Sequence, residues 1–121
     1  MTGVLTLVST PIGHLGDLAP RAVEALEAAD LVCCEDTRRT GSLLKQIGVR
    51  VDELRRLDDH TEFESIPVIL DRLGAGERVV LVSDAGTPGI SDPGERLVAA
   101  VAEAGIEVTT VPGPVAAIAA L

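Results

Sequence analysis

Five short apolar segments alternate with helical patterns along this chain of 121 residues. Apolar runs of this kind, rich in β-branched side chains, are typical of buried strands. Strands that alternate with helices form parallel sheets, because each helix returns the chain by a right-handed crossover. The sequence therefore predicts an α/β fold with an open, mainly parallel five-stranded sheet flanked by helices. The expected strands are Val4–Val8, Leu31–Cys34, Leu54–Leu57, Arg78–Ser83 and Glu107–Val111.

Proline and glycine mark the first two helices. Pro20 predicts a helix from about Arg21 to Ala29, since proline is tolerated in a first turn whose N–H groups lack helical partners. A second helix is expected from about Thr40 to Ile47. Gly48 would follow it in the left-handed conformation that ends many helices.

Capping patterns mark the later helices. Thr61 and Glu64 fit a capping box, and Pro67 is expected to delay the regular helix to about Ser65–Leu73. The segment Asp92-Pro93-Gly94-Glu95 predicts another helix start, with the aspartate at the N-cap, the proline at N1 and the glutamate at N3. That helix is expected to end at Gly105.

A last helix is expected from Val115 to Leu121, where the sequence stops without a terminating residue. We therefore expect a truncation: residues 1–121 would be one domain of a longer protein. No signal peptide or membrane-spanning stretch is recognisable, so a cytoplasmic protein without membrane contact is expected.

The composition limits the partners of this chain. It has one Phe and no Trp or Tyr, which removes the aromatic platforms that stack on single-stranded nucleic acid. Its formal charge of −9 repels phosphate backbones, so this piece alone is predicted to bind nucleic acid poorly. Cys33 and Cys34 are neighbours in a predicted strand and should point to opposite faces, which disfavours a disulfide or a shared metal.

Three loops rich in glycine and proline follow the first, fourth and fifth predicted strands. They are Ser9–Asp17, Ser83–Gly94 and Pro112–Pro114. In a parallel sheet all three open on the carboxyl edge, where ligands bind in α/β proteins. Their stiff backbone suits an uncharged or zwitterionic ligand with an adenine-like group. The usual glycine-rich phosphate-binding motifs are absent.

Acidic residues also stand at predicted strand ends, as Glu35/Asp36, Asp58/Asp59 and Asp84. A carboxylate there can serve as a general base on a hydroxyl. It can equally brace the loop by accepting backbone hydrogen bonds. The Arg38-Arg39 pair has two readings as well, a phosphate contact or a solvated pair.

The loop motifs resemble those of the tetrapyrrole (corrin/porphyrin) methylase superfamily, and within it the branch that modifies small-subunit ribosomal RNA. The resemblance implies a two-domain enzyme, often a homodimer, that binds S-adenosyl-L-methionine between its domains without a metal. It would methylate the ribose 2′-OH of a cytidine in the decoding region of 16S RNA. Residues 1–121 would be its N-terminal α/β domain, with the C-terminal domain absent. The matching segments are Ser9–Gly13, Leu15–Leu18, Cys34–Arg38, Ser83–Gly94 and Pro112–Pro114.

The resemblance also implies cofactor contacts on the three loops, whereas the catalytic residue stays open among Glu35, Asp36 and Asp84. The implied contacts are Pro11, Ile12, Ala85, Gly86, Thr87, Pro88, Ile90, Pro112, Gly113, Val115 and Ala116.

The chain departs from the usual pattern of this branch at four places. His14 replaces Asn, Ala19 replaces Thr, and Asp58–Glu62 replaces His-x-His-Asn-Glu. Val115 stands where a small polar residue is usual, which bears on cofactor affinity.

Two other functions remain open. One is C-methylation of a tetrapyrrole by an enzyme of the same superfamily, although the glycine-rich loops typical of those enzymes are absent. The other is a non-enzymatic domain that binds a nucleotide-like ligand.

Overall fold

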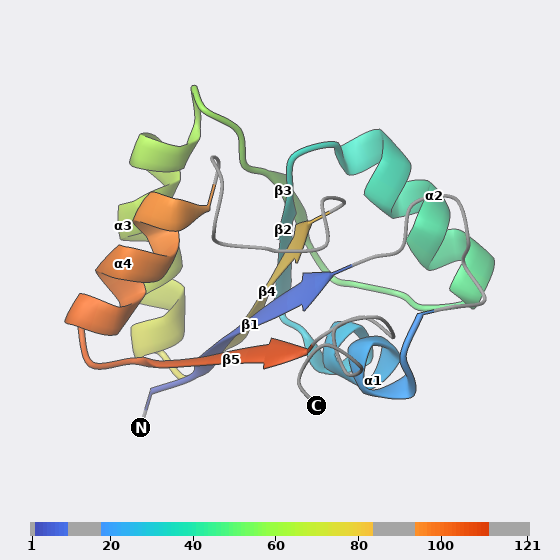
Figure 1. The fold of residues 1–121 in the computed structure, drawn as a ribbon, viewed down its shortest axis with the longest axis horizontal. Coiled ribbons are helices and arrows are strands. Elements are labelled where there is room, and N and C mark those ends of the chain that lie inside the picture. Colours follow the sequence, from blue (N-terminus) through green and yellow to red (C-terminus); the bar gives the residue numbers. More distant parts are fainter. Residues whose placement is uncertain (1, 10–17, 84–93, 112–121) are drawn as a thin grey trace, which may run out of the picture.

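A parallel five-stranded sheet forms the centre of the computed structural model, which describes residues 2–9, 18–83 and 94–111 (Figure 1). The strand order is β3-β2-β4-β1-β5, and every pairing is parallel. This confirms the predicted fold class. The strands are β1 (Val4–Ser9), β2 (Leu31–Cys34), β3 (Leu54–Arg56), β4 (Arg78–Ser83) and β5 (Glu107–Val111).

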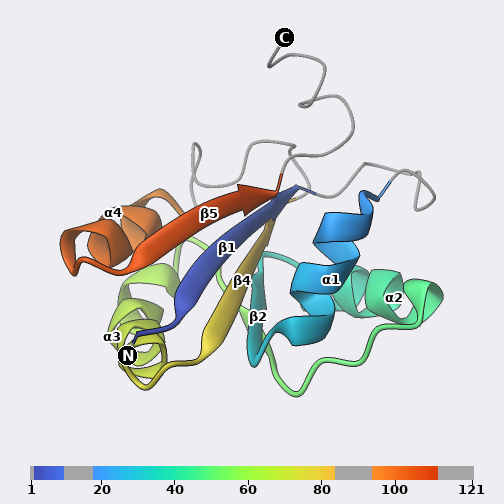
Figure 2. The same ribbon diagram turned by 90° about the horizontal axis from the view of Figure 1, so that it is seen from below.

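Within the described residues, four helices cover the sheet, two on each face (Figure 2). Helices α1 (Pro20–Ala28) and α2 (Thr37–Ile47) lie on one side, and α3 (Glu62–Gly74) and α4 (Glu95–Glu103) on the other. Each face has its own aliphatic core, because successive side chains of a strand point to opposite sides. Cys33 belongs to the α3/α4 core and Cys34 to the α1/α2 core, as predicted, and both side chains are buried.

The register places the carboxyl ends of β4, β1 and β5 at the same level of the sheet. Ser9 of β1 pairs with Ser83 of β4, and Val8 of β1 pairs with Val111 of β5. The strand ends that precede the three glycine/proline segments therefore lie side by side at one edge of the sheet.

The predicted start of the second helix was wrong by about one turn. Helix α2 begins at Thr37 because Asp36 is its N-cap, with the carboxylate accepting hydrogen bonds from the N–H groups of Arg38 and Arg39. Its end was predicted correctly, since Gly48 has a φ of 74°. Helix α1 also begins as expected, with Pro20 in its first turn.

The capping box predicted at Thr61 and Glu64 does not form. Thr61 is the N-cap residue of α3, but its side chain makes no capping hydrogen bond to that helix. It is instead hydrogen-bonded to Asp58, three residues earlier. The N–H of Asp58 donates to Thr61 Oγ1 at 2.9 Å, and Asp58 Oδ1 accepts from the N–H groups of His60 and Thr61 at 2.9 Å each. Helix α3 consequently begins earlier than predicted, and Pro67 lies inside it.

Helix α4 begins at Glu95, with Gly94 at the N-cap. The sequence pattern had placed Glu95 at N3, two positions further into the helix, which was wrong. Asp92 and Pro93, and the helix expected from Val115 to Leu121, lie outside the described residues. Within the described segments, no helix has the length and apolar character needed to cross a membrane.

Candidate functional site at the carboxyl edge

The residues expected to contact the cofactor all belong to segments outside the described residues, as does Asp84. Pro11 and Ile12, residues 85–88 with Ile90, and Pro112, Gly113, Val115 and Ala116 fall in this group. The structure describes the strand ends from which these segments start, namely Ser9, Ser83 and Val111. Their level register is the geometric basis for a single site at this edge.

Glu62 holds the residue at which the Ser83–Gly94 segment joins α4. Its carboxyl oxygen Oε2 accepts hydrogen bonds from the backbone N–H groups of Gly94 at 2.9 Å, Arg96 at 3.1 Å and Leu97 at 3.2 Å. Glu62 is only 1% exposed. These N–H groups belong to the first turn of α4, where no intrahelical acceptor exists. The first residue of α3 thus caps the neighbouring helix.

Sequence reasoning missed this role of Glu62. A cap is normally sought within a few residues of the helix start, whereas Glu62 precedes Leu97 by 35 positions. The available signal was the family motif that ends at this glutamate, because Asp58 and Thr61 differ from its usual residues while the glutamate is retained.

Asp58 organises the turn that brings Glu62 into place. Besides its bonds to Thr61 and His60, it pairs with Arg56 Nε at 2.8 Å. Burial of the carboxyl opposes ionisation, but the hydrogen bonds from Thr61 and His60 and the charge of Arg56 outweigh it, and the pKa of Asp58 is lowered. In the structure, therefore, Asp58 carries out the bracing role considered for it.

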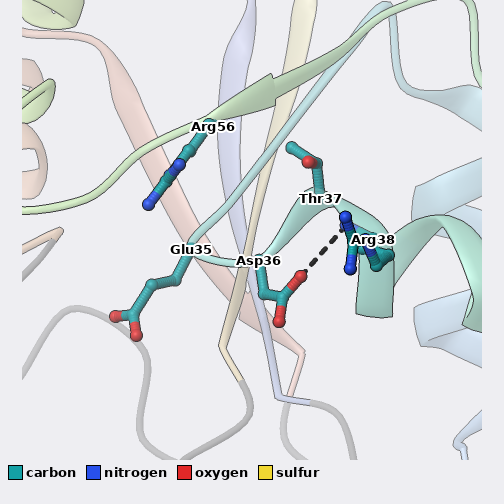
Figure 3. A pocket seen from close by; sticks show the side chains of 5 residues that line it. All are labelled: Glu35, Asp36, Thr37, Arg38 and Arg56. Carbon is teal, nitrogen blue, oxygen red and sulfur yellow. Dashed lines mark hydrogen bonds between the residues drawn. The ribbon is translucent and has the colours of Figure 1, made fainter.

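A polar cavity of about 380 Å³ lies where β2 and β3 end. It is lined by Glu35, Asp36, Thr37, Arg38 and Arg56. Figure 3 shows Arg56 reaching in from β3, while Glu35 and Asp36 come from the connection between β2 and α2, and Thr37 and Arg38 from the first turn of α2. Register explains the meeting, because Cys34 and Arg56 are partners in the parallel ladder. The segment Glu35–Arg38 and Arg56, which is distant in sequence, therefore line the same cavity.

Glu35 and Asp36 have different surroundings in this cavity. Asp36 Oδ1 accepts two backbone hydrogen bonds of 3.0 Å, from Arg38 and Arg39. The bond from Arg39, followed by that from Arg38, lowers the pKa of Asp36. Glu35 is exposed, and within the described part of the chain its carboxylate has no hydrogen-bond or ion-pair partner. The Asp36 carboxylate is thus occupied by capping α2, whereas the Glu35 carboxylate is available to a ligand.

The described part of the chain contains no group of three or more His, Cys, Asp or Glu residues placed to hold a metal ion.

A parallel α/β sheet in which three neighbouring strands end level at the carboxyl edge is typical of α/β domains that bind ligands there. The chain belongs to the tetrapyrrole (corrin/porphyrin) methylases, whose family model matches residues 4–121. This confirms the superfamily indicated by the loop motifs.

Curated relatives narrow the comparison within that family. The chain is 53% identical over 119 residues to a protein of Synechocystis named ribosomal RNA small subunit methyltransferase I. It is 50% identical over 119 residues to a protein of the same name from Escherichia coli O157:H7. Each match covers 98% of this chain but only 42% and 41%, respectively, of the relative. The chain therefore spans less than half the length of these proteins.

Solved structures show the same fold. Uroporphyrin-III C-methyltransferase from Thermus thermophilus matches with a TM-score of 0.71 and 25% identity, over 93% of this chain and 48% of that one. Cobalt precorrin-4 methyltransferase matches with a TM-score of 0.75 at 21% identity, over 91% and 45% of the two chains.

Proposed function

We propose that this chain is the N-terminal α/β domain of an S-adenosyl-L-methionine-dependent methyltransferase of small-subunit ribosomal RNA. The target would be the ribose 2′-OH of a cytidine in the decoding region. The observation that carries the proposal is the motif-bearing carboxyl edge, together with about 50% identity to relatives named for rRNA methylation. A second domain would supply the other wall, and the full protein would work as a cytoplasmic homodimer.

The cofactor would bind where the loops after β1, β4 and β5 leave the sheet. Its zwitterionic amino-acid part and uncharged adenosine part need backbone donors and acceptors more than charged side chains. Loops rich in glycine and proline present such groups at close range. When bound, the sulfonium supplies an activated methyl group, and the protein aligns the acceptor and receives its proton.

Glu35 is the better candidate for that proton-accepting group between the two described carboxylates. It is exposed in the cavity beside the loop edge and has no partner among the described residues. Asp36 is held by two backbone N–H groups, and its lowered pKa makes it a weaker base. The availability of its carboxylate in the cavity therefore favours Glu35.

The competing function is C-methylation of a tetrapyrrole. It draws support from the similarity to uroporphyrin-III C-methyltransferase at 25% identity. The much higher identity to the RNA-modifying relatives favours the RNA reading.

The test uses the full-length protein with methyl-labelled S-adenosyl-L-methionine. One reaction receives small ribosomal subunits from a strain lacking the enzyme, and a parallel reaction receives uroporphyrinogen III. Label in the ribosomal RNA, at a ribose 2′-oxygen, is expected. Label in the tetrapyrrole with none in the RNA would establish the competing function instead.

A further inference from the structure

The cavity between β2 and β3 is not used by the proposed cofactor site. The cofactor loops leave β4, β1 and β5, which are neighbours at one side of the sheet. The cavity lies at the ends of β2 and β3, on the other side of β4. It is thus adjacent to the methyl donor's expected position but separate from it, which is where a methyl acceptor must sit.

Two guanidinium groups line this cavity on an otherwise acidic chain. Arg38 comes from the first turn of α2, and its guanidinium has no ion pair or hydrogen bond with any described residue. Arg56 comes from the end of β3 and pairs with Asp58 through Nε at 2.8 Å, with its side chain 67% exposed. A guanidinium carries five N–H donors, so most of the donors of both arginines are available to a ligand.

Two other arginines of the described chain, by contrast, already have partners. Arg72 bonds to Glu53 at 2.7 Å and to Glu77 at 2.8 Å, and Arg55 Nε bonds to Ser65 Oγ at 3.1 Å. Arg38 and Arg56 differ from these two in keeping unoccupied donors, and both line the cavity. With a formal charge of −9 on the chain, a polyanion needs such local cations to approach it.

We propose that Arg38 and Arg56 bind a backbone phosphate of the substrate RNA, next to the nucleotide that is methylated. The inference rests on the proposed function and extends it to a named binding site. Planar guanidinium forks match phosphate oxygens and form paired, charge-assisted hydrogen bonds. A cavity of about 380 Å³ falls within the size range of small-ligand sites. A phosphate held there places its ribose near Glu35, on the same wall.

Three features separate this site from a simple anion-binding helix end. The N-terminus of α2 is already capped by Asp36, so the backbone N–H groups of Arg38 and Arg39 are occupied. The donors offered to the phosphate belong to side chains from two different elements. Glu35 adds an acceptor beside them, which suits a group that carries both a phosphate and a hydroxyl.

The test measures methylation of small ribosomal subunits by the full-length protein over a range of subunit and salt concentrations. Arg38→Ala and Arg56→Ala are each expected to raise KM for the subunits by about tenfold or more, as expected for loss of a charge-assisted contact. Each should also reduce the slope of log affinity against log salt concentration by about one. The Kd for S-adenosyl-L-methionine should stay within about twofold of the wild type.

Lys45→Ala is the matched control, because Lys45 is an exposed cation at the opposite end of α2. It removes the same charge without touching the cavity and should leave KM and the salt slope unchanged. Arg38→Lys keeps the charge but loses the planar fork, and an intermediate KM is expected.

Asp58→Asn controls for the ion pair of Arg56, since it breaks that pair while keeping the arginine and an acceptor for the α3 cap. Wild-type KM in this variant, with a raised KM in Arg56→Ala, supports the phosphate contact.

Wild-type KM and salt slope in both alanine variants would overturn the site while leaving the proposed function intact. Equal losses of subunit and cofactor binding would also overturn it, because they indicate a structural role. A wild-type protein that does not methylate the subunits at all would instead refute the proposed function.

Discussion

The carboxyl oxygen Oε2 of Glu62 lies 2.9 Å from the backbone nitrogen of Gly94. This bond joins the first residue of α3 to the residue that precedes α4 and ends the motif Ser83–Gly94. Gly94 has a φ of 121°, a conformation that side-chain-bearing residues rarely adopt. The carboxyl thus fixes both a helix start and the end of the proposed cofactor loop.

Glu62→Ala should lower the free energy of unfolding by about 2–4 kcal/mol, because three backbone N–H groups lose their buried acceptor. Glu62→Gln retains an oxygen acceptor and should cost about 1 kcal/mol. Urea denaturation measures both. In the full-length protein, S-adenosyl-L-methionine should bind more weakly to Glu62→Ala than to Glu62→Gln.

The matched control is Glu64→Ala, two residues further along α3 on an exposed position. Its unfolding free energy and cofactor affinity should equal those of the wild type. If Glu62→Ala were as stable as this control, the cap seen in the structure would contribute nothing.

Strand positions could be predicted from sequence because each strand is short, apolar and flanked by helical patterns. The expected segments 78–83 and 107–111 coincide with β4 and β5. Strand alternation also placed Cys33 and Cys34 in separate cores. These features depend on local periodicity, which is readable in a single sequence.

The N-terminal caps of α3 and α4 could not be predicted, because several residues competed for the same role. Thr61 has the right type for an N-cap, but its hydroxyl pairs with Asp58 instead. Glu95 fits a capping pattern locally, yet its helix is capped by Glu62 from another element. The cavity could not be predicted either, because Arg56 and Arg38 are far apart in sequence. They come to the same cavity through the parallel pairing of β2 and β3. Contacts across elements leave no local trace in sequence.

Glu35→Gln should lower kcat for subunit methylation by about 10²–10⁴-fold, if Glu35 receives the proton of the ribose hydroxyl. The change preserves size and removes only the basic oxygen. Cofactor binding should be unaffected. Initial rates at saturating subunits and cofactor measure the effect in the full-length protein.

Asp36→Asn tests the neighbouring carboxyl in the same assay. Asparagine is a good N-cap, so α2 should keep its start and kcat should stay within a few-fold of the wild type. The reverse pattern, with a large loss in Asp36→Asn and none in Glu35→Gln, would assign the catalytic role to Asp36.

Gly48→Ala should destabilise the protein by about 1 kcal/mol, because Gly48 has a φ of 74° at the end of α2. Gly74→Ala is the contrasting change, at the last residue of α3, where an added Cβ would meet nothing within 4 Å. It should be neutral or stabilising by up to about 1 kcal/mol. Urea midpoints of the two variants should therefore shift in opposite directions or by clearly different amounts, and equal shifts would contradict the left-handed helix end.

The buried Cys33 thiol should make the folded protein less stable at alkaline pH. Burial, with a smaller effect from Cys34, raises the pKa of Cys33 from 9.0 to about 12. Between these values the folded state keeps a proton that the unfolded state releases. The stability linked to this group is therefore complete below pH 9 and is lost as the pH rises toward 12. The slope contributed is up to about 1.4 kcal/mol per pH unit.

Cys33→Ala removes this titration and should flatten the fall of the unfolding free energy between pH 9 and 11. At pH 7 the variant should be less stable by about 1 kcal/mol, because a small buried side chain is shortened. Urea denaturation at a series of pH values measures both effects. Parallel curves for wild type and variant across this range would show that Cys33 ionises equally well in the folded and unfolded states, contrary to its complete burial in the α3/α4 core.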